Sequence, residues 1–390
     1  ENDNLAIGYE AMGVDTAGGT LNVAVGNYAL DALTSGDSNV GVGHNSLGAN
    51  NSGNRNTAIG DDALKAHTTG NNNVAVGYQA LLVDTTGAQN VAIGKGALEA
   101  NTTAADNTAV GADALTANTT GAGNVAVGKG ALAAHTTAEG NTAIGKAALA
   151  TITTVVRNTA VGFEALTAQT TGYNNTAIGY VAGKAMTEGY QNTLVGDRAG
   201  TAITTGDNNT AVGQHALKTA TTADSNTAIG FDALTLNTSG TRNVAVGADT
   251  LKTVTTGGYN TAVGSQAMQL HTTGSENTAI GYGALYSSTT GTKSVSLGKN
   301  SLRLNTTGTE NTALGYQAMD KNTTGSENTA VGSYAMLAAG AGASNTAIGY
   351  KAGTAITGGG NNSLLGFNAG GSLTGGGNNI TVSGLDAHFK

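Results

Sequence analysis

The 390-residue sequence contains no cysteine, no proline and no tryptophan, and only 11% of its residues are charged. The absence of cysteine excludes disulfides, thiolate metal sites and cysteine catalysis. The formal charge is −8, from 17 basic and 25 acidic residues. This balance argues against nucleic-acid binding, which needs clustered lysine and arginine. No apolar run approaches the roughly 20 residues of a membrane span, so we expect no membrane insertion.

The sequence does have abundant glycine, 61 residues, and a strict repeat. Asn returns every 17 residues from Asn22 to Asn379, with Ser294 as the single replacement, and Asn4 begins one further copy. The 23 copies share the consensus N-[TV]-A-[VI]-G-x-x-A-L-x-x-x-T-T-G-x-x. Coil positions 1 to 17 are counted from this Asn throughout.

The repeat predicts an all-β fold. Positions 1 to 4 alternate β-branched and small residues, which is typical of a strand of about five residues, and Gly at position 5 ends that strand. We expect a second short strand at Ala-Leu, positions 8 and 9, and turns at Thr-Thr-Gly. A helical repeat is a poor alternative because it needs upwards of about 30 residues. The prediction is one parallel β-solenoid, or β-roll, of about 22 coils over residues 1–382, with residues 383–390 as a divergent C-terminal end, a cap or a processing remnant.

Alternation assigns the two faces of the predicted strand. Position 4 is aliphatic in all 23 copies, so we expect it to point into the roll, opposite the Leu or Met of position 9. Position 3, usually Ala, would then face outward. A stripe of small residues suggests close packing of another chain, and Ala109, Ala126 and Ala143 are candidates for this face. A parallel homotrimer would cover it.

Two further patterns concern packing along the stack. The Asn of position 1 is expected to form a hydrogen-bonded ladder between coils; the representatives are Asn56, Asn73, Asn90, Asn107 and Asn124. Where Gly replaces Leu at position 9, position 12 becomes apolar, as if to refill the lost volume. The Gly residues are Gly183, Gly200, Gly353 and Gly370, with Met186, Ile203, Ile356 and Leu373 at position 12.

The sequence offers no concentrated set of catalytic or metal-binding residues. His67, His135 and His271 share position 12 but lie at least four coils apart, and we interpret them as solvent-facing turn residues that replace Asn. Asp61 and Asp62 are adjacent, so on a strand their side chains would point to opposite faces. We therefore expect neither enzymatic activity nor a cofactor or metal.

Nine of the 16 aromatic residues fall at position 6. Polar and charged residues fill this position in most other coils, which marks it as exposed. Such rings could stack on the sugars of a cell-surface glycan; the tyrosines concerned are Tyr9, Tyr78, Tyr180, Tyr282, Tyr316 and Tyr350. The simpler alternative is that each ring covers the strand corner against the next coil or chain.

Thr-Thr at positions 13 and 14 raises an alternative of another class, an ice-binding solenoid. Stacked coils would align these residues into two Thr columns. Adjacent Thr side chains diverge, however, whereas ice-binding arrays favour Thr-x-Thr on one face. Hydrogen-bonded turn formation is the simpler role.

Repeats of the form Asn-Thr-Ala-Val-Gly-x-x-Ala-Leu-x-x-x-Thr-Thr-Gly resemble those of phage tail fibres and of bacterial surface proteins with tail-fibre domains. They are more distantly similar to the head repeats of trimeric autotransporter adhesins. The resemblance covers residues 4 to about 382. It implies a left-handed trimeric β-roll on a virion or a bacterial surface.

Together these observations predict a non-enzymatic, extracellular, trimeric fibre shaft that carries host attachment, with an adhesin stalk as the alternative. Its expected partners are two further copies of the chain, other fibre or tail components, and a host-surface glycan or protein.

Overall fold

The computed structural model describes residues 3–14 and 18–383, and within these ranges it contains strands and turns but no helix. The chain divides into two compact units, Glu1–Asn192 and Thr193–Lys390. Each unit is a parallel β-solenoid in which one 17-residue coil contributes one strand. The predicted all-β solenoid is therefore confirmed. Residues 384–390, nearly all of the expected divergent end, lie outside the described residues.

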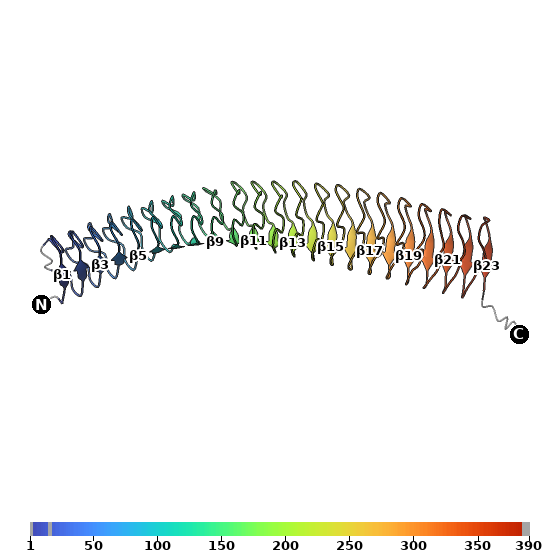
Figure 1. Cartoon of the computed structure of the whole chain (residues 1–390), viewed down its shortest axis with the longest axis horizontal. Coiled ribbons are helices and arrows are strands. Elements are labelled where there is room, and N and C mark those ends of the chain that lie inside the picture. The colour runs from blue at the N-terminus through green and yellow to red at the C-terminus, as the bar shows by residue number, and fades with distance from the viewer. Residues whose placement is uncertain (1–2, 15–17, 384–390) are drawn as a thin grey trace. The chain divides into compact units, whose positions relative to one another are not determined.

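Within each unit the strands follow one another in chain order along one edge of the stack, with the turns opposite (Figure 1). The strands of the first unit are β1 (Leu5–Ile7), β2 (Val23–Val25), β3 (Val40–Val42), β4 (Thr57–Ile59), β5 (Val74–Val76), β6 (Val91–Ile93), β7 (Thr108–Val110), β8 (Val125–Val127), β9 (Thr142–Ile144), β10 (Thr159–Val161) and β11 (Thr176–Ile178). The strands of the second unit are β12 (Thr193–Val195), β13 (Thr210–Val212), β14 (Thr227–Ile229), β15 (Val244–Val246), β16 (Thr261–Val263), β17 (Thr278–Ile280), β18 (Val295–Leu297), β19 (Thr312–Leu314), β20 (Thr329–Val331), β21 (Thr346–Ile348), β22 (Ser363–Leu365) and β23 (Ile380–Val382).

The strands pair in register, so each coil position stacks on its equivalent. Ala109 of β7, for example, pairs with Ala126 of β8, which pairs with Ala143 of β9. Each strand covers only positions 2 to 4, three residues rather than the expected five. Because side chains alternate, the middle residue points to one face and its two neighbours point to the other.

The expected second strand at positions 8 and 9 does not form. Positions 7 and 9 adopt left-handed backbone conformations, as at Asp113 (φ 58°) and Leu115 (φ 51°), which are incompatible with an extended strand. The backbone is nevertheless bonded from coil to coil here, because Leu115 N–H donates to the carbonyl of Ala131 at 3.0 Å. This segment is a hydrogen-bonded turn that repeats from coil to coil over the described residues.

Glycine at position 5 is required for two reasons. Gly111 has φ 135°, a conformation that residues with a side chain rarely adopt. A Cβ at this position would also lie 2.7 Å from the carbonyl oxygen of Gly128 in the next coil. The same close approach recurs from coil to coil and ends each strand.

The interior of the coil is small, and the predicted assignment of the strand faces is wrong. Ala109, Ala126 and Ala143 of position 3 are completely buried within the chain, packed among the buried Ala of position 8 and Leu of position 9. Position 4 faces outward, and Ile144 keeps 39% of its surface exposed. The three Ala residues therefore cannot form a surface for another chain, whereas Leu at position 9 is the core residue that was expected.

Exceptions to the consensus show why the inner position is small. Leu194 and Leu364 stand at position 3, where Ala is usual, and both are buried. A Cβ on Gly200, at position 9 of the same coil, would lie 2.8 Å from Cδ2 of Leu194. A Cβ on Gly370 would lie 2.9 Å from Cδ2 of Leu364. Positions 3 and 9 thus share one space, which holds a single large side chain.

The predicted refilling by position 12 is confirmed for three coils and is weaker in the fourth. Met186, Ile203 and Ile356 are completely buried, whereas Leu373 is half-buried. The terminal Cδ1 atom of Ile203 would lie 2.9 Å from a Cβ on Gly200. Volume lost at position 9 is therefore replaced from two directions, positions 3 and 12.

Candidate functional site

The Asn residues of position 1 form the predicted ladder, and they are buried. The backbone N–H of Asn124 donates to Oδ1 of Asn107 at 2.9 Å, and Asn107 N–H donates to Oδ1 of Asn90 at 3.0 Å. Asn107 Nδ2 also donates to the carbonyl of Gly121, at position 15 of its own coil, at 2.9 Å. Each Asn therefore closes its own coil and joins it to the next. Asn56, Asn73 and Asn90 make the same contacts.

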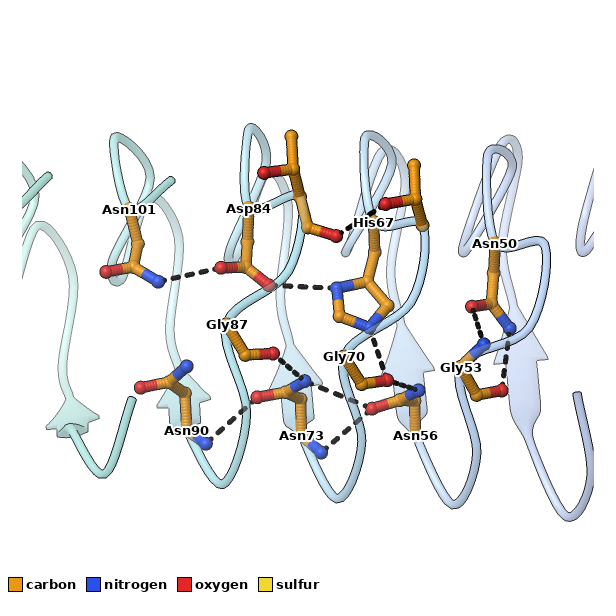
Figure 2. Close-up of polar contacts among 12 residues, drawn as sticks. Asn50, Gly53, Asn56, His67, Gly70, Asn73, Asp84, Gly87, Asn90 and Asn101 are labelled. Atoms are coloured by element: carbon orange, nitrogen blue, oxygen red, sulfur yellow. Dashed lines mark hydrogen bonds and ion pairs between the residues drawn. The ribbon is translucent and has the colours of Figure 1, made fainter. Parts of the chain in front are cut away.

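A second polar column lies inside the coil, at position 12. Figure 2 shows His67, Asp84 and Asn101 pointing toward the Asn ladder, with the carbonyl groups of position 15 between the two rows. His67 Nε2 and Asn56 Nδ2 contact the carbonyl oxygen of Gly70, at 2.8 and 2.9 Å. The expectation that the His residues of position 12 face solvent is wrong, because His67, His135 and His271 are all completely buried.

His67 and Asp84 form a buried pair. Nδ1 of His67 lies 2.8 Å from Oδ2 of Asp84, and both side chains are inaccessible to solvent. The carbonyl of Gly70 can only accept, so Nε2 carries a hydrogen, and a further proton lies between Nδ1 and the carboxylate. Asp84 Oδ1 accepts from Asn101 Nδ2 at 2.8 Å. The pair is therefore hydrogen-bonded on both sides and closed to solvent.

His135 and His271 are buried without a charged partner. Burial lowers the pKa of His135, and the hydrogen bond from Nε2 to the Ala138 carbonyl, at 2.9 Å, opposes this shift. Burial likewise lowers the pKa of His271, whose Nε2 lies 2.8 Å from the Gly274 carbonyl. Both imidazoles are therefore held neutral, and they take the place of Asn in the position-12 column.

The outward face of the strands carries no charge. Position 2 is Thr or an aliphatic residue in nearly every coil, position 4 is always aliphatic, and no coil has a charged residue at either position. In most coils of both units these two positions are half-exposed, with Ile59, Ile93, Ile229 and Ile280 exposed by 39–42%. Sequence reasoning missed this surface because it assigned the larger side chains to the interior.

The aromatic residues of position 6 lie at the corner that follows each strand, and their predicted exposure is confirmed. The six candidate tyrosines are exposed to between 40% and 62% of their surface: Tyr9, Tyr78, Tyr180, Tyr282, Tyr316 and Tyr350. Some of these rings also cover the neighbouring coil. Tyr350 stacks on Phe367 with ring centroids 5.5 Å apart, and Phe163 stacks on Tyr180 at the same spacing. Their role in glycan binding stays a prediction.

The two Thr columns differ in their hydrogen bonding. Thr102 and Thr119 of position 13 are half-buried, and each hydroxyl donates to the position-13 carbonyl of the following coil, at 3.0 and 3.1 Å. Thr103 and Thr120 of position 14 are exposed. The first column is therefore engaged in joining coils, as the turn-forming interpretation expects, and the second faces solvent.

One mixed cluster brings metal-binding atoms together. Ligand atoms of His44, Asp61 and Asp62 lie within 4.8 Å of one another, and His44 Nδ1 is 3.0 Å from Asp61 Oδ1. The expectation that Asp61 and Asp62 point to opposite faces is wrong, because Asp62 is at position 7 and has a left-handed backbone (φ 57°). Asp62 Oδ1 is already paired with Lys65 Nζ at 3.2 Å.

The second unit contains a hollow that sequence reasoning missed. It has a volume of about 370 Å³ and is lined by Gln266, Tyr282, Gly283, Tyr286, Asn300 and Arg303. The available signal was a concentration of departures from the repeat. Tyr286 is the only aromatic residue at position 10, and the next coil contains Ser294 in place of the ladder Asn.

Comparisons with protein-family models and with curated proteins give no match. Over residues 3–14 and 18–383, no helix is present that could cross a membrane.

Proposed function

We propose that the chain is a structural, non-enzymatic shaft of an extracellular fibre, and that three parallel copies associate through the outward faces of their strands. The observation that carries this proposal is the uncharged face formed by positions 2 and 4. It replaces the Ala column as the association surface. The fibre would carry attachment to a host surface, as a phage tail fibre or a bacterial adhesin stalk does.

The continuity of this face supports association. Position 4 presents a partly exposed aliphatic side chain in every described coil, and position 2 adds Thr or an aliphatic residue beside it in nearly all of them. A stable interface takes roughly 800 Å² from each partner, and a face repeated over many coils can supply a large area. A long uncharged strip of exposed aliphatic residues is unusual on a monomer.

The narrowness of the face favours three chains over two. Each strand has only three residues, about 10 Å, so the face is a long, thin stripe. Three such stripes can meet around a common axis and bury one another, with Thr hydroxyls of position 2 toward the edges. Because every coil repeats the same spacing, parallel copies present matching rows of side chains to one another.

The test is the molecular mass of the 390-residue chain in solution, measured by light scattering after size exclusion. The proposal expects the mass of three chains. A monomer at all concentrations would overturn it. The triple variant Val110→Lys, Val127→Lys and Ile144→Lys should be monomeric with an unchanged circular dichroism spectrum, because these side chains point away from the core.

A matched control variant carries the same charges elsewhere on the same coils. Thr120→Lys, Thr137→Lys and Thr154→Lys place three lysines at exposed position 14. This variant should keep the trimeric mass. Dissociation of both variants alike would point to a general effect of charge and would count against the proposed face.

Ice binding is the second candidate, and the outward strand face supports it better than the Thr columns of positions 13 and 14 do. Positions 2 and 4 place Thr beside Val or Ile on one regularly spaced face, as at Thr108 and Val110 of β7. A face used for ice would stay exposed in a monomer. An ice-growth assay on the protein in its native oligomeric state separates the two candidates. A monomer that shapes ice crystals supports ice binding, whereas a trimeric shaft predicts no effect on crystal habit.

A further inference from the structure

We infer that the hollow between Tyr282 and Tyr286 in the second unit is a carbohydrate-binding site that accepts one pyranose ring of a glycan. This inference goes beyond the proposed shaft function and does not depend on it. The hollow lies on the turn segment, positions 6 to 10, rather than on the outward strand face.

Gly283, at position 7, leaves room for the hollow; Gly96 and Gly130 are the other glycines at this position. Gly283 lies buried at its floor, and a Cβ there would lie 2.7 Å from Oδ1 of Asn300 in the next coil. Most other coils carry a larger residue at this position, such as Asp113 or Gln317. The volume of about 370 Å³ is at the small end of the range for ligand sites and suits a single sugar ring.

Two aromatic rings line this hollow. Tyr282, at position 6, is 49% exposed, and Tyr286, at position 10, is half-buried. A pyranose has one face of C–H groups and a rim of hydroxyls, and a tyrosine ring offers a rigid apolar surface with a polar tip. Lys299 Nζ lies 5.8 Å from the centroid of the Tyr282 ring, which adds a cation beside it.

Polar groups suited to sugar hydroxyls complete the lining. Gln266 and Asn300 contribute amides, each of which both donates and accepts hydrogen bonds. Arg303 is held in place by Asp320, with Nε 2.7 Å from Oδ1 and the guanidinium NH2 group 3.3 Å from Oδ2. Asp320 is nearly inaccessible, with 4% of its side chain exposed, so it anchors the arginine from beneath. The remaining N–H groups of Arg303 are left for a ligand.

Backbone hydrogen bonds between neighbouring coils hold the residues around the hollow, which favours a preformed site. The N–H of Asn300 donates to the Tyr282 carbonyl at 2.9 Å, and the N–H of Ser287 donates to the Arg303 carbonyl at 2.9 Å. The coil that supplies Asn300 and Arg303 also departs from the consensus, with Ser294, Ser296 and Ser301 replacing Asn and two Ala.

The experiment is saturation-transfer NMR on the full chain with three probes: methyl glucoside, methyl galactoside and methyl glucuronide. We expect transfer to at least one of them. Tyr282→Ala and Gly283→Asn should each weaken that binding by about tenfold or abolish it. Asn is found at position 7 in other coils, as at Asn45 (φ 60°), so Gly283→Asn fills the hollow without breaking the fold.

The matched control is Tyr78→Ala, which removes a position-6 ring of similar exposure, 46%, from a coil of the first unit. It should leave the transfer unchanged. Absence of transfer to all three probes, or equal loss in Tyr78→Ala, would overturn the inference. The mass of each variant, measured in parallel, separates this outcome from failure of the proposed trimer.

Discussion

Positions 3 and 4 of the strand are neighbours in the chain and have opposite environments. In β8, Ala126 is completely buried, whereas Val127 remains half-exposed beside it. The smaller side chain is inside because position 9 already fills the interior with Leu132. The comparison teaches that in a thin coil the room available, rather than hydrophobicity alone, decides which side chains are buried. The larger aliphatic residues are then left on the surface, where another chain can cover them.

The largest expected effect comes from placing an aspartate at position 3 rather than at position 4. Ala126→Asp would bury a carboxylate without a partner, which costs at least several kcal/mol and should unfold the surrounding coils. Val127→Asp leaves the carboxylate in solvent, so it should preserve the fold and act on association alone. Thermal melts followed by circular dichroism measure the difference. Equal destabilisation by both variants would contradict the assignment of the faces.

A second pair of variants tests whether positions 3 and 9 share one interior space. Leu194→Ala leaves a cavity and should cost about 2–5 kcal/mol. Gly200→Leu overfills the same space and should cost about 1–3 kcal/mol or more. In the double variant the new Leu occupies the space that Leu194 vacates, so its free energy of unfolding should exceed the additive expectation by about 0.5–3 kcal/mol. Strict additivity in urea titrations would show that the two positions do not share one space.

The buried Asn ladder of position 1 should stabilise the fold through its hydrogen bonds. Asn107→Ala removes the acceptor for Asn124 N–H and the donor to Gly121, and should cost about 1–3 kcal/mol. The reverse change, Ser294→Asn, restores the missing bond to the position-15 carbonyl and should add about 1 kcal/mol. Urea titration of both variants measures these effects. A stabilising Asn107→Ala would mean that the ladder is incidental.

The smallest expected effect concerns pH. Burial lowers the folded-state pKa of His135 below that of the unfolded chain, so the unfolded state binds its proton first as the pH falls. Stability is therefore full above the ordinary value of about 6.5 and is lost as the pH decreases below it. His135→Asn, which copies the neighbouring Asn118, should remove this part of the acid sensitivity. Melting temperatures of both proteins between pH 7.5 and 5 provide the measurement, and parallel curves would contradict the burial argument.

The sequence was sufficient for the features that depend on periodicity. The 17-residue spacing predicts the coil, the Gly that occupies position 5 in all copies but the last predicts the end of the strand, and the repeated Asn predicts the ladder. These inferences succeed because all copies obey the same local geometry. The refilling of Gly200 by Ile203 was also visible, because it appears as a covariation between copies.

The sequence alone did not show which face of the strand is buried or where the hollow lies. Alternation says that positions 3 and 4 point apart, but it does not say which one is inside, and residue size suggested the wrong choice. The left-handed backbone of positions 7 and 9, which brings Asp61 and Asp62 together and removes the expected second strand, has no signature in Leu or Asp. The hollow beside Tyr282 depends on side chains from several neighbouring coils, so single positions do not show it.

Because the chain has no cysteine, a disulfide introduced at one position reports directly on contact between copies. In the proposed fibre, the outward strand face joins parallel chains. Under mild oxidation Val127→Cys should give covalently linked chains, while Thr120→Cys, on the exposed turn, should give none at the same concentration. Linked chains from Thr120→Cys but not from Val127→Cys would contradict the proposed interface.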